Sequence, residues 1–235
     1  CSSDLLPVVA SLPPDDPNLK VNITMGYPLK FSQAYGLVDL LKRLHIESSL
    51  YSKSSATFYH RMVMPILQHP CIARLCTTDV TYKIINEIVS KNIVRIDAQI
   101  FSSNEILKYI FAPLNASNVA EYMKHIFKLI ANCEDCDEIS RECAAKIVQI
   151  ANRFDDVLDK YKENLGNQTD DLKVVLSMFC SLVNGQNVDL LGEPLGGLQI
   201  MGILETRTID FDNIIVMDLN EGVFPKKNAA MTFIP

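Results

Sequence analysis

Leu198-Gln-Ile-Met-Gly-Ile-Leu-Glu-Thr-Arg-Thr-Ile-Asp-Phe211 continues directly into Asp212-Asn-Ile-Ile-Val-Met-Asp218 and then into Leu219-Asn-Glu-Gly-Val-Phe-Pro225. The apolar residues Leu198, Ile200 and Ile203 predict a short strand at the start of this segment. The near-continuous apolar run from Ile214 to Met217 predicts a second strand, and such a run is typical of a strand buried on both faces. The segment therefore predicts part of a parallel sheet that is covered by helices.

A polar link and a turn complete this pattern. The link from Glu205 to Asp210 joins the two predicted strands, where open α/β sheets usually place their ligand-binding loops. Gly and Pro are the strongest local signals for a turn, and both occur after the second strand. The residues expected to form this structural turn are Asn220, Glu221, Gly222, Phe224 and Pro225.

The same segment resembles motif V and the following strand of superfamily I DNA helicases of the UvrD type. Their pattern is roughly V-Q-L-M-T-L-H-x-x-K-G-L-E-F, then an apolar strand, then E-E-G-x-F-P. The segment is more similar still to the inactivated helicase-like half of AddB-type proteins of the PD-(D/E)XK nuclease family, which has L-E-x-R-x-x-D-F-D and L-N-E-G-x-F-P. The resemblance extends without a gap from Leu198 to Pro225, about an eighth of the chain.

A second match lies about 170 residues upstream, in the order that the family implies. Val21 to Met25 predicts a strand, Gly26 and Pro28 predict a turn, and the apolar spacing within Phe31 to Leu44 predicts a helix. Asn22 to Leu29 resembles the AddB-type phrase N-x-T-M-G-Y-P-L. UvrD-type helicases have a comparable strand, glycine turn and helix just before a large helical insertion.

The chain between the two matches has helical periodicity. We expect helices over Thr57–Gln68, Asp79–Ser90, Asn104–Phe111, a segment that Ser117 caps, Asp137–Glu163 and Asp171–Leu182. The predicted fold class is α/β: the two ends of the chain, residues 1–50 and 185–235, form a partial RecA-like parallel sheet. Residues 51–184 form a large all-helical insertion between them, as in the second RecA-like domain of the resembled helicases.

The resemblance assigns positions in the motif V-like loop. It implies DNA contact at Gly202, Leu204 and Arg207, and it places Thr208 and Asp210 where active relatives have a glycine and a glutamate near the nucleotide. A Thr cannot give the close backbone approach of a glycine, and Leu204 cannot donate a hydrogen bond. Thr208 and Asp210 therefore indicate a degenerate nucleotide site, and Leu204 departs from the DNA-contacting residue of active relatives.

No cofactor is expected in this chain, because the sequence lacks the G-x-x-x-x-G-K-[ST] string of a P-loop. ATP and Mg²⁺ are expected only if the chain belongs to a longer, active protein. No catalytic residue is predicted either. The only acid-x-Lys triplet, Asp171-Leu-Lys173, lies in a helical pattern and lacks the strand context of a nuclease site.

The cysteines do not predict a metal site. Seven cysteines at irregular spacings fit reduced thiols better than a disulfide framework. Cys133-Glu-Asp-Cys136, with Cys143 nearby, has no second pair to complete a four-ligand zinc site. A redox role for Cys133 and Cys136 lacks its usual βαβ setting, and the sequence leaves the role of this pair open.

The net charge of −6 argues against a domain that binds nucleic acid over its whole surface, because neutralising phosphates requires clustered Lys and Arg. A local basic strip remains open, in which Tyr27 and Phe31 could stack on bases. Its candidate bases are Lys20, Lys30, Lys42, Arg43, Arg207, Lys226 and Lys227. The sequence lacks an apolar run of membrane-spanning length, so no membrane partner is expected, and we expect a cytoplasmic location.

The function implied by the resemblance is DNA recombination and repair. The chain is expected to be a catalytically degenerate helicase-like module of a helicase–nuclease subunit, which holds single-stranded or forked DNA and docks a partner subunit without hydrolysing ATP. Two alternatives stay open. The chain is a fragment of an active ATP-dependent DNA helicase whose P-loop lies elsewhere, or it is a structural protein-interaction domain. Whether the parent protein is an enzyme is left undecided.

Overall fold

The computed structural model describes residues 7–8, 11–12, 21–23, 26–51, 57–165, 171–189, 197–202 and 210–217. The chain divides into two compact units, one formed by Cys1–Met25 with Asp189–Pro235 and the other by Gly26–Val188. The architecture is mixed α/β. Helix α2 (Gln33–Tyr51), most of which the sequence assigns to the α/β ends, lies in the second unit.

The first unit contains the small parallel sheet. Strand β1 (Val21–Ile23) pairs with strand β6 (Leu198–Ile200), and Asn22 lies opposite Gln199 in the register. The expected parallel pairing of the two ends of the chain is therefore confirmed for these strands. The first strand of the opening segment was predicted to include Leu198, Ile200 and Ile203. In the structure it ends at Ile200, and Ile203 lies outside the described residues.

The apolar run Ile214–Met217 does not form the buried strand that the sequence predicts. It has no regular secondary structure, and its side chains are exposed by 68, 88, 49 and 56% along the run. A buried strand needs a hydrogen-bonded neighbour and apolar cover on both faces. Among the described residues of this unit, β1 and β6 pair only with each other, so the run lacks that neighbour. The prediction was wrong here.

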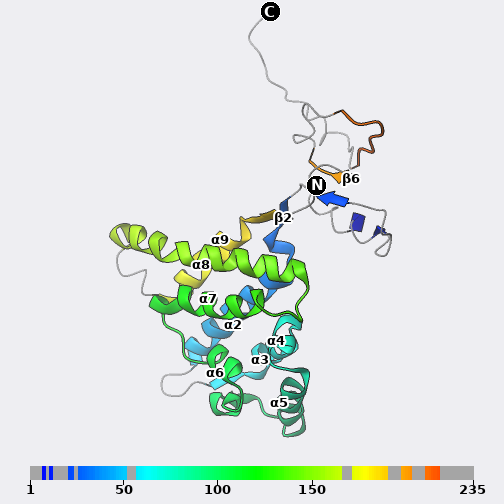
Figure 1. The fold of residues 1–235 in the computed structure, drawn as a ribbon. Coiled ribbons are helices and arrows are strands. Elements are labelled where there is room, and N and C mark those ends of the chain that lie inside the picture. The colour runs from blue at the N-terminus through cyan, green and yellow to red at the C-terminus, as the bar shows by residue number, and fades with distance from the viewer. Residues whose placement is uncertain are drawn as a thin grey trace, which may run out of the picture. The chain divides into compact units, whose positions relative to one another are not determined.

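The second unit is mainly helical (Figure 1). Its remaining elements are β2 (Gly26–Pro28), η1 (Leu29–Phe31), β3 (Thr57–Tyr59), α3 (His60–Leu67), α4 (Pro70–Leu75), α5 (Thr78–Ser90), β4 (Arg95–Asp97), η2 (Ala98–Phe101), α6 (Glu105–Ile110), η3 (Ala116–Asn118), α7 (Val119–Ala131), α8 (Glu138–Leu165), α9 (Leu172–Asn184) and β5 (Asn187–Asp189). Strand β2 pairs with β5, and β3 pairs antiparallel with β4.

Several helix ends differ from the sequence prediction. Ser117, expected to cap a helix, lies within η3, and α7 begins at Val119 without a side-chain cap. The expected helix Thr57–Gln68 begins as strand β3 and becomes helical only at His60. His69 and Pro70 then start the next helix, α4, because the His69 ring accepts a hydrogen bond from the Cys71 amide at 3.3 Å. Proline suits the first turn of a helix, where its missing amide hydrogen is not needed.

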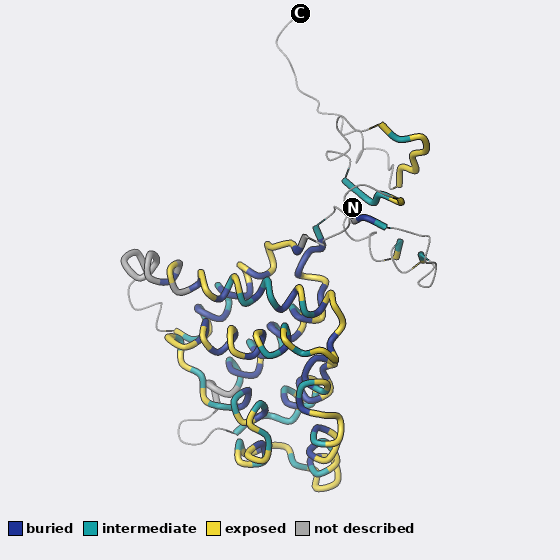
Figure 2. The backbone as a smooth tube through the Cα atoms, viewed as in Figure 1, coloured by how far each residue is buried: buried dark blue, intermediate teal, exposed yellow. Residues whose placement is uncertain are grey.

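Helices α7 and α8 form the centre of the helical core. They lie side by side, and buried positions alternate with exposed ones along both helices (Figures 1 and 2). The fully or nearly fully buried side chains include Tyr122, Met123, Ile126, Phe127 and Ile130 on α7 and Cys143, Ile147, Ala151 and Phe154 on α8. Burial of each large apolar side chain contributes about 1.5–3 kcal/mol, so this helix pair makes a large contribution to the packing energy of the unit.

A histidine is buried inside this core. His45 on α2 is 1% exposed, and its Nε2 lies 2.9 Å from the Tyr122 hydroxyl, which donates to the Ile110 carbonyl at 2.7 Å. Because the Tyr122 proton is used on Ile110, Nε2–H of His45 donates to the hydroxyl oxygen. Burial lowers the pKa of His45 to about 4, since the charged imidazolium loses its hydration.

We predict that this histidine makes folding sensitive to acid. The folded-state pKa lies below the unfolded value of about 6.5, so the unfolded chain takes up the proton first. The contribution of His45 is present above pH 6.5 and is lost as the pH falls towards 4. Between pH 7 and pH 5 the free energy of unfolding should fall by about 2 kcal/mol from this group, as measured by urea unfolding. His45→Gln should have a correspondingly smaller change, and equal changes in both proteins would contradict the assignment.

We also predict that Ile215→Asp has little effect on stability. The Ile215 side chain is 88% exposed, and exposed substitutions usually change the free energy of unfolding by less than about 0.5 kcal/mol. Ile147→Asp, at a fully buried position on α8, is the matched control and should be severely destabilising. A loss of several kcal/mol in the Ile215 variant would instead support the buried strand that the sequence predicts.

Candidate functional site

The carboxyl edge of the β1–β6 sheet is the first candidate site. Because the strands are parallel, both carboxyl ends lie at the same edge, where β1 ends at Ile23 and β6 ends at Ile200. Met201 and Gly202 follow β6, and both are half-buried. Open α/β sheets bind their ligands at this edge. The structure therefore places Gly202, a predicted DNA-contacting residue, at the edge expected for a ligand loop.

A side-chain hydrogen bond joins the two strands next to this edge. Asn22 Nδ2 donates to Gln199 Oε1 at 2.6 Å, and Asn22 is only 4% exposed. A buried amide without a partner costs about 1–3 kcal/mol, so this bond explains why an apolar strand tolerates Asn22. Sequence reasoning missed the pair. The available signal was a polar residue in each of the two matched segments.

Only part of the predicted motif V-like site falls among the described residues. Asp210 is exposed and has no regular secondary structure. Leu204, Arg207 and Thr208 lie outside the described residues. So do the residues of the predicted structural turn, which are Asn220, Glu221, Gly222, Phe224 and Pro225. Their roles therefore stay predictions.

The second candidate site lies on η1 in the helical unit. Phe31 is 48% exposed, and the Lys30 ammonium lies 4.7 Å from the centroid of its ring, within the range of a cation–π interaction. Tyr27 is 4% exposed, so its ring is not available for base stacking, and that suggestion was wrong. A basic group beside an exposed ring can accept a nucleic-acid base and its phosphate.

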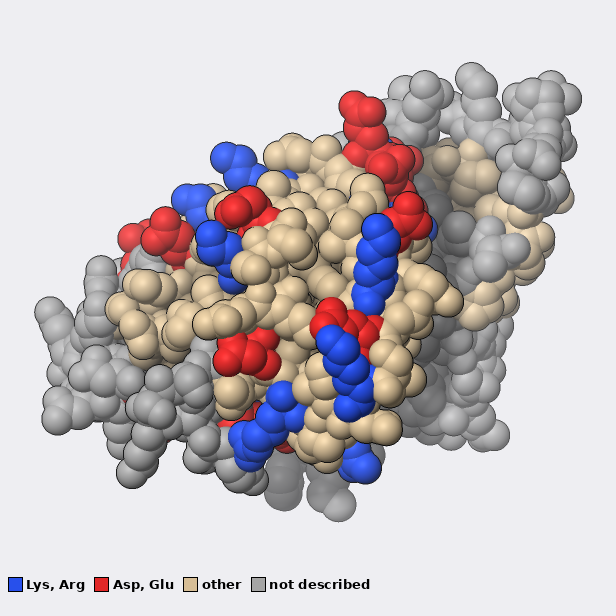
Figure 3. Space-filling view, turned by 90° about the horizontal axis from the view of Figure 1, so that it is seen from below, with Lys and Arg blue, Asp and Glu red and all other residues tan. Residues whose placement is uncertain are grey.

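Charges of both signs share the surface of the helical unit. On the described part of the face in Figure 3, basic and acidic side chains are interspersed. Exposed ion pairs link Arg43 to Asp39 at 2.6 Å and Lys91 to Glu87 at 2.6 Å. Arg43, one of the candidate bases, therefore already has an acidic partner. The mixed charges argue against a broad basic surface on the part of this unit that the structure describes.

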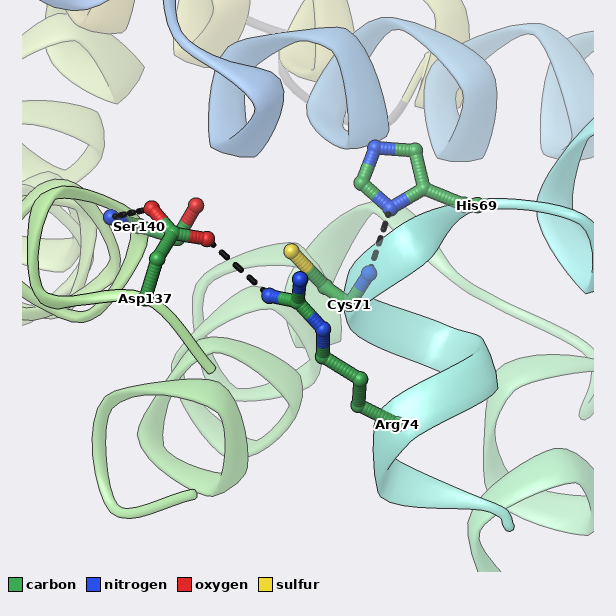
Figure 4. A network of polar contacts seen from close by, with 5 residues as sticks. All are labelled: His69, Cys71, Arg74, Asp137 and Ser140. Carbon is green, nitrogen blue, oxygen red and sulfur yellow. Dashed lines mark hydrogen bonds and ion pairs between the residues drawn. The ribbon is translucent and has the colours of Figure 1, made fainter. Parts of the chain in front are cut away.

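A polar network joins α4 to the start of α8 (Figure 4). Arg74 donates to Asp137 Oδ1 at 3.0 Å, and Asp137 Oδ2 accepts the Ser140 amide at 3.0 Å, which caps α8. Partial burial acts to raise the pKa of Asp137, but the Ser140 and Arg74 hydrogen bonds outweigh it and lower that pKa. The network fixes two helices, and sequence patterns contain no signal for the Arg74 contact.

His69 completes the region drawn in Figure 4. Its Nδ1 accepts the Cys71 amide, so its Nε2–H donates to the Gln33 carbonyl at 3.2 Å. Burial lowers the pKa of His69, although the Gln33 bond acts against this. Both ring nitrogens have backbone partners, so the residue holds α4 in place and is not available as a general base.

The described residues contain no group of three or more His, Cys, Asp or Glu side chains placed to hold a metal ion. Within the same residues, no helix combines the length and the apolar composition that a membrane crossing requires. Asp171, from the acid-x-Lys triplet, accepts the Lys173 amide at 2.8 Å and so caps α9.

A comparison of the chain with family models, curated proteins and solved structures finds no match.

We predict that Asn22 and Gln199 are energetically coupled. A double-mutant cycle with Asn22→Ala and Gln199→Ala should give a coupling of about 0.5–1.5 kcal/mol in the free energy of unfolding, because each single variant leaves one amide without its partner. The exposed pair Asp39 and Arg43 is the control, with an expected coupling of about 0.3–0.5 kcal/mol. Additive effects at Asn22 and Gln199 would contradict the bond.

Proposed function

We propose that this chain is a catalytically degenerate helicase-like module that holds single-stranded or forked DNA, and that it docks a motor subunit without hydrolysing ATP. Its two ends would form part of a RecA-like sheet, and its helices would be the insertion of an AddB-type helicase–nuclease subunit. The proposal concerns DNA recombination and repair.

The pairing of the two resembling segments is the observation that supports this proposal most. Asn22–Leu29 and Leu198–Pro225 each resemble the same family, and their first strands lie side by side in parallel with Asn22 opposite Gln199. Unrelated chance matches would have no reason to meet in one sheet. Parallel order also suits a RecA-like sheet, in which the connections cross over through helices.

The chemistry of the motif V-like loop supports a binding role over an ATPase role. Thr208 stands where close backbone approach to a phosphate requires glycine. Leu204 stands where active relatives have a hydrogen-bonding histidine. Arg207 keeps a positive charge at the lysine position, so attraction to a phosphate is the part of the chemistry that the loop retains.

We predict that Arg207→Glu weakens DNA binding. Loss of one phosphate contact and the added repulsion should raise the Kd for single-stranded and forked DNA about tenfold at moderate salt, and should reduce the salt slope by about one. Fluorescence anisotropy with labelled oligonucleotides measures both quantities.

Lys124→Glu is the matched control, because Lys124 is an exposed base on α7, outside the motif V-like loop. It makes the same change in net charge and should leave the Kd within about twofold, since a base that makes no phosphate contact acts only through long-range attraction, which salt screens. Equal losses in both variants would indicate a general charge effect. No salt-sensitive binding by the unmodified chain would overturn the DNA role.

A protein-docking function is the second candidate, and the exposed run Ile214–Met217 favours it. Four adjacent apolar side chains in solvent can be covered by a strand of another protein. A complex with a motor subunit that survives deletion of residues 204–210, but is lost in Ile215→Lys, would favour docking as the main role over DNA contact.

A further inference from the structure

Two cysteines occupy the ends of one tight turn between α7 and α8. The Cys136 amide donates to the Cys133 carbonyl at 3.2 Å. In such a turn the first and last Cα atoms lie within about 7 Å, and disulfides typically span about 4.4–6.8 Å between Cα atoms. The Cys133 thiol is also one of the neighbours that raise the pKa of Cys136, so the two side chains lie near each other. The turn therefore brings the two cysteines within the backbone span of a disulfide.

The two thiols differ in their access to solvent. Cys133 is half-buried, whereas Cys136 is 4% exposed and lies near Arg74 and Cys71, both of which act on its pKa. A reagent from solution therefore reaches Cys133 first. Cys136 is placed to attack whatever Cys133 has bound, because it lies directly across the turn.

We propose that Cys133 and Cys136 form a dithiol–disulfide pair, in which Cys133 reacts first with a small disulfide and Cys136 resolves the product. With glutathione disulfide, the Cys133 thiolate attacks one sulfur, forms a mixed disulfide and releases one glutathione thiolate. The Cys136 thiolate then attacks the Cys133 sulfur and releases the second. The protein loses two protons and two electrons, and the glutathione disulfide becomes two reduced glutathiones.

The environment of Cys136 supports this order of steps. Burial, and then the contact with Cys133, raise the pKa of Cys136 to about 12, so this thiol stays protonated while Cys133 is reduced. A Cys133 sulfur in a mixed disulfide has neither charge nor proton, so its share of that shift disappears. Arg74 still favours the Cys136 thiolate. Burial, the largest cause, is unchanged, so the pKa of Cys136 stays raised but by less than before, and its thiolate fraction increases once Cys133 has reacted.

Cys71 is the competing partner for Cys136, because the two thiols lie near enough to act on each other's pKa. Cys71 is fully buried on α4 and far from Cys136 in sequence. A reagent cannot reach Cys71 from solution without opening the packing, and neither of these two thiols is accessible enough to start the reaction. Because Cys133 is the most accessible of these three thiols, the reaction starts there and yields the Cys133–Cys136 pair. This inference does not depend on the proposed DNA role.

The test is native oxidation of the chain in buffers of increasing ratio of oxidised to reduced glutathione. Samples are quenched in acid, alkylated and digested with trypsin, which cleaves after Lys128 and Arg141 and so leaves both cysteines in one peptide. Mass spectrometry should find that peptide lighter by two hydrogen atoms and protected from alkylation, at ratios that leave Cys180 reduced.

Three variants fix the roles. Cys136→Ser should trap glutathione on Cys133, with the mixed disulfide about tenfold or more above the unmodified chain. Cys133→Ser should leave Cys136 reduced, and Cys71→Ser should still form the internal disulfide. Circular dichroism checks that each variant is folded. A Cys71–Cys136 cross-link, a mixed disulfide that persists in the unmodified chain, or a fully reduced peptide at every ratio would each overturn the proposal.

Discussion

The parallel pairing of β1 with β6 is the constraint on which the rest of the fold depends. Parallel strands cannot be joined by a tight turn, and here the connection is the whole unit Gly26–Val188. Bringing the ends of a long flexible connection together costs only about 0.6 kcal/mol more for each doubling of its length. A connection that is itself folded costs less, because its ends are already restricted. The Asn22–Gln199 bond fixes the register, because a slip by one residue would place the Asn22 amide opposite an apolar residue and leave it unsatisfied.

Apolar packing, and not surface charge, stabilises the helical unit. Each large side chain buried between α7 and α8 is worth about 1.5–3 kcal/mol, whereas an exposed ion pair contributes about 0–1 kcal/mol. The Arg74–Asp137 pair is partly exposed and is important for its position, since Asp137 also caps α8. That cap adjoins Cys136, so the network and the thiol pair share the turn between α7 and α8. Apolar packing within Gly26–Val188 therefore makes this connection between β1 and β6 a compact unit of its own.

Long periodic segments were predictable from sequence, and short or tertiary features were not. The predicted helix Asp137–Glu163 corresponds to α8 (Glu138–Leu165), because its apolar stripe repeats over many turns. Strands β3 and β4 have three residues each, too few for a periodic signal. For Ile214–Met217 the sequence predicted a strand that the structure lacks. An apolar composition does not show whether a neighbouring strand is present to pair with the run. At the candidate sites, Gly202 and Phe31 were predictable as candidates, but the Asn22–Gln199 bond needed the register of the strands.

The central claim is that the two separate family-like segments meet in one parallel sheet, and nuclear magnetic resonance of the isotope-labelled chain tests it most directly. Cross-strand nuclear Overhauser contacts between residues 21–23 and 198–200 report both direction and register. We expect a parallel pattern with Asn22 opposite Gln199. An antiparallel pattern, a register shifted by one residue, or no contact between these segments would contradict the claim.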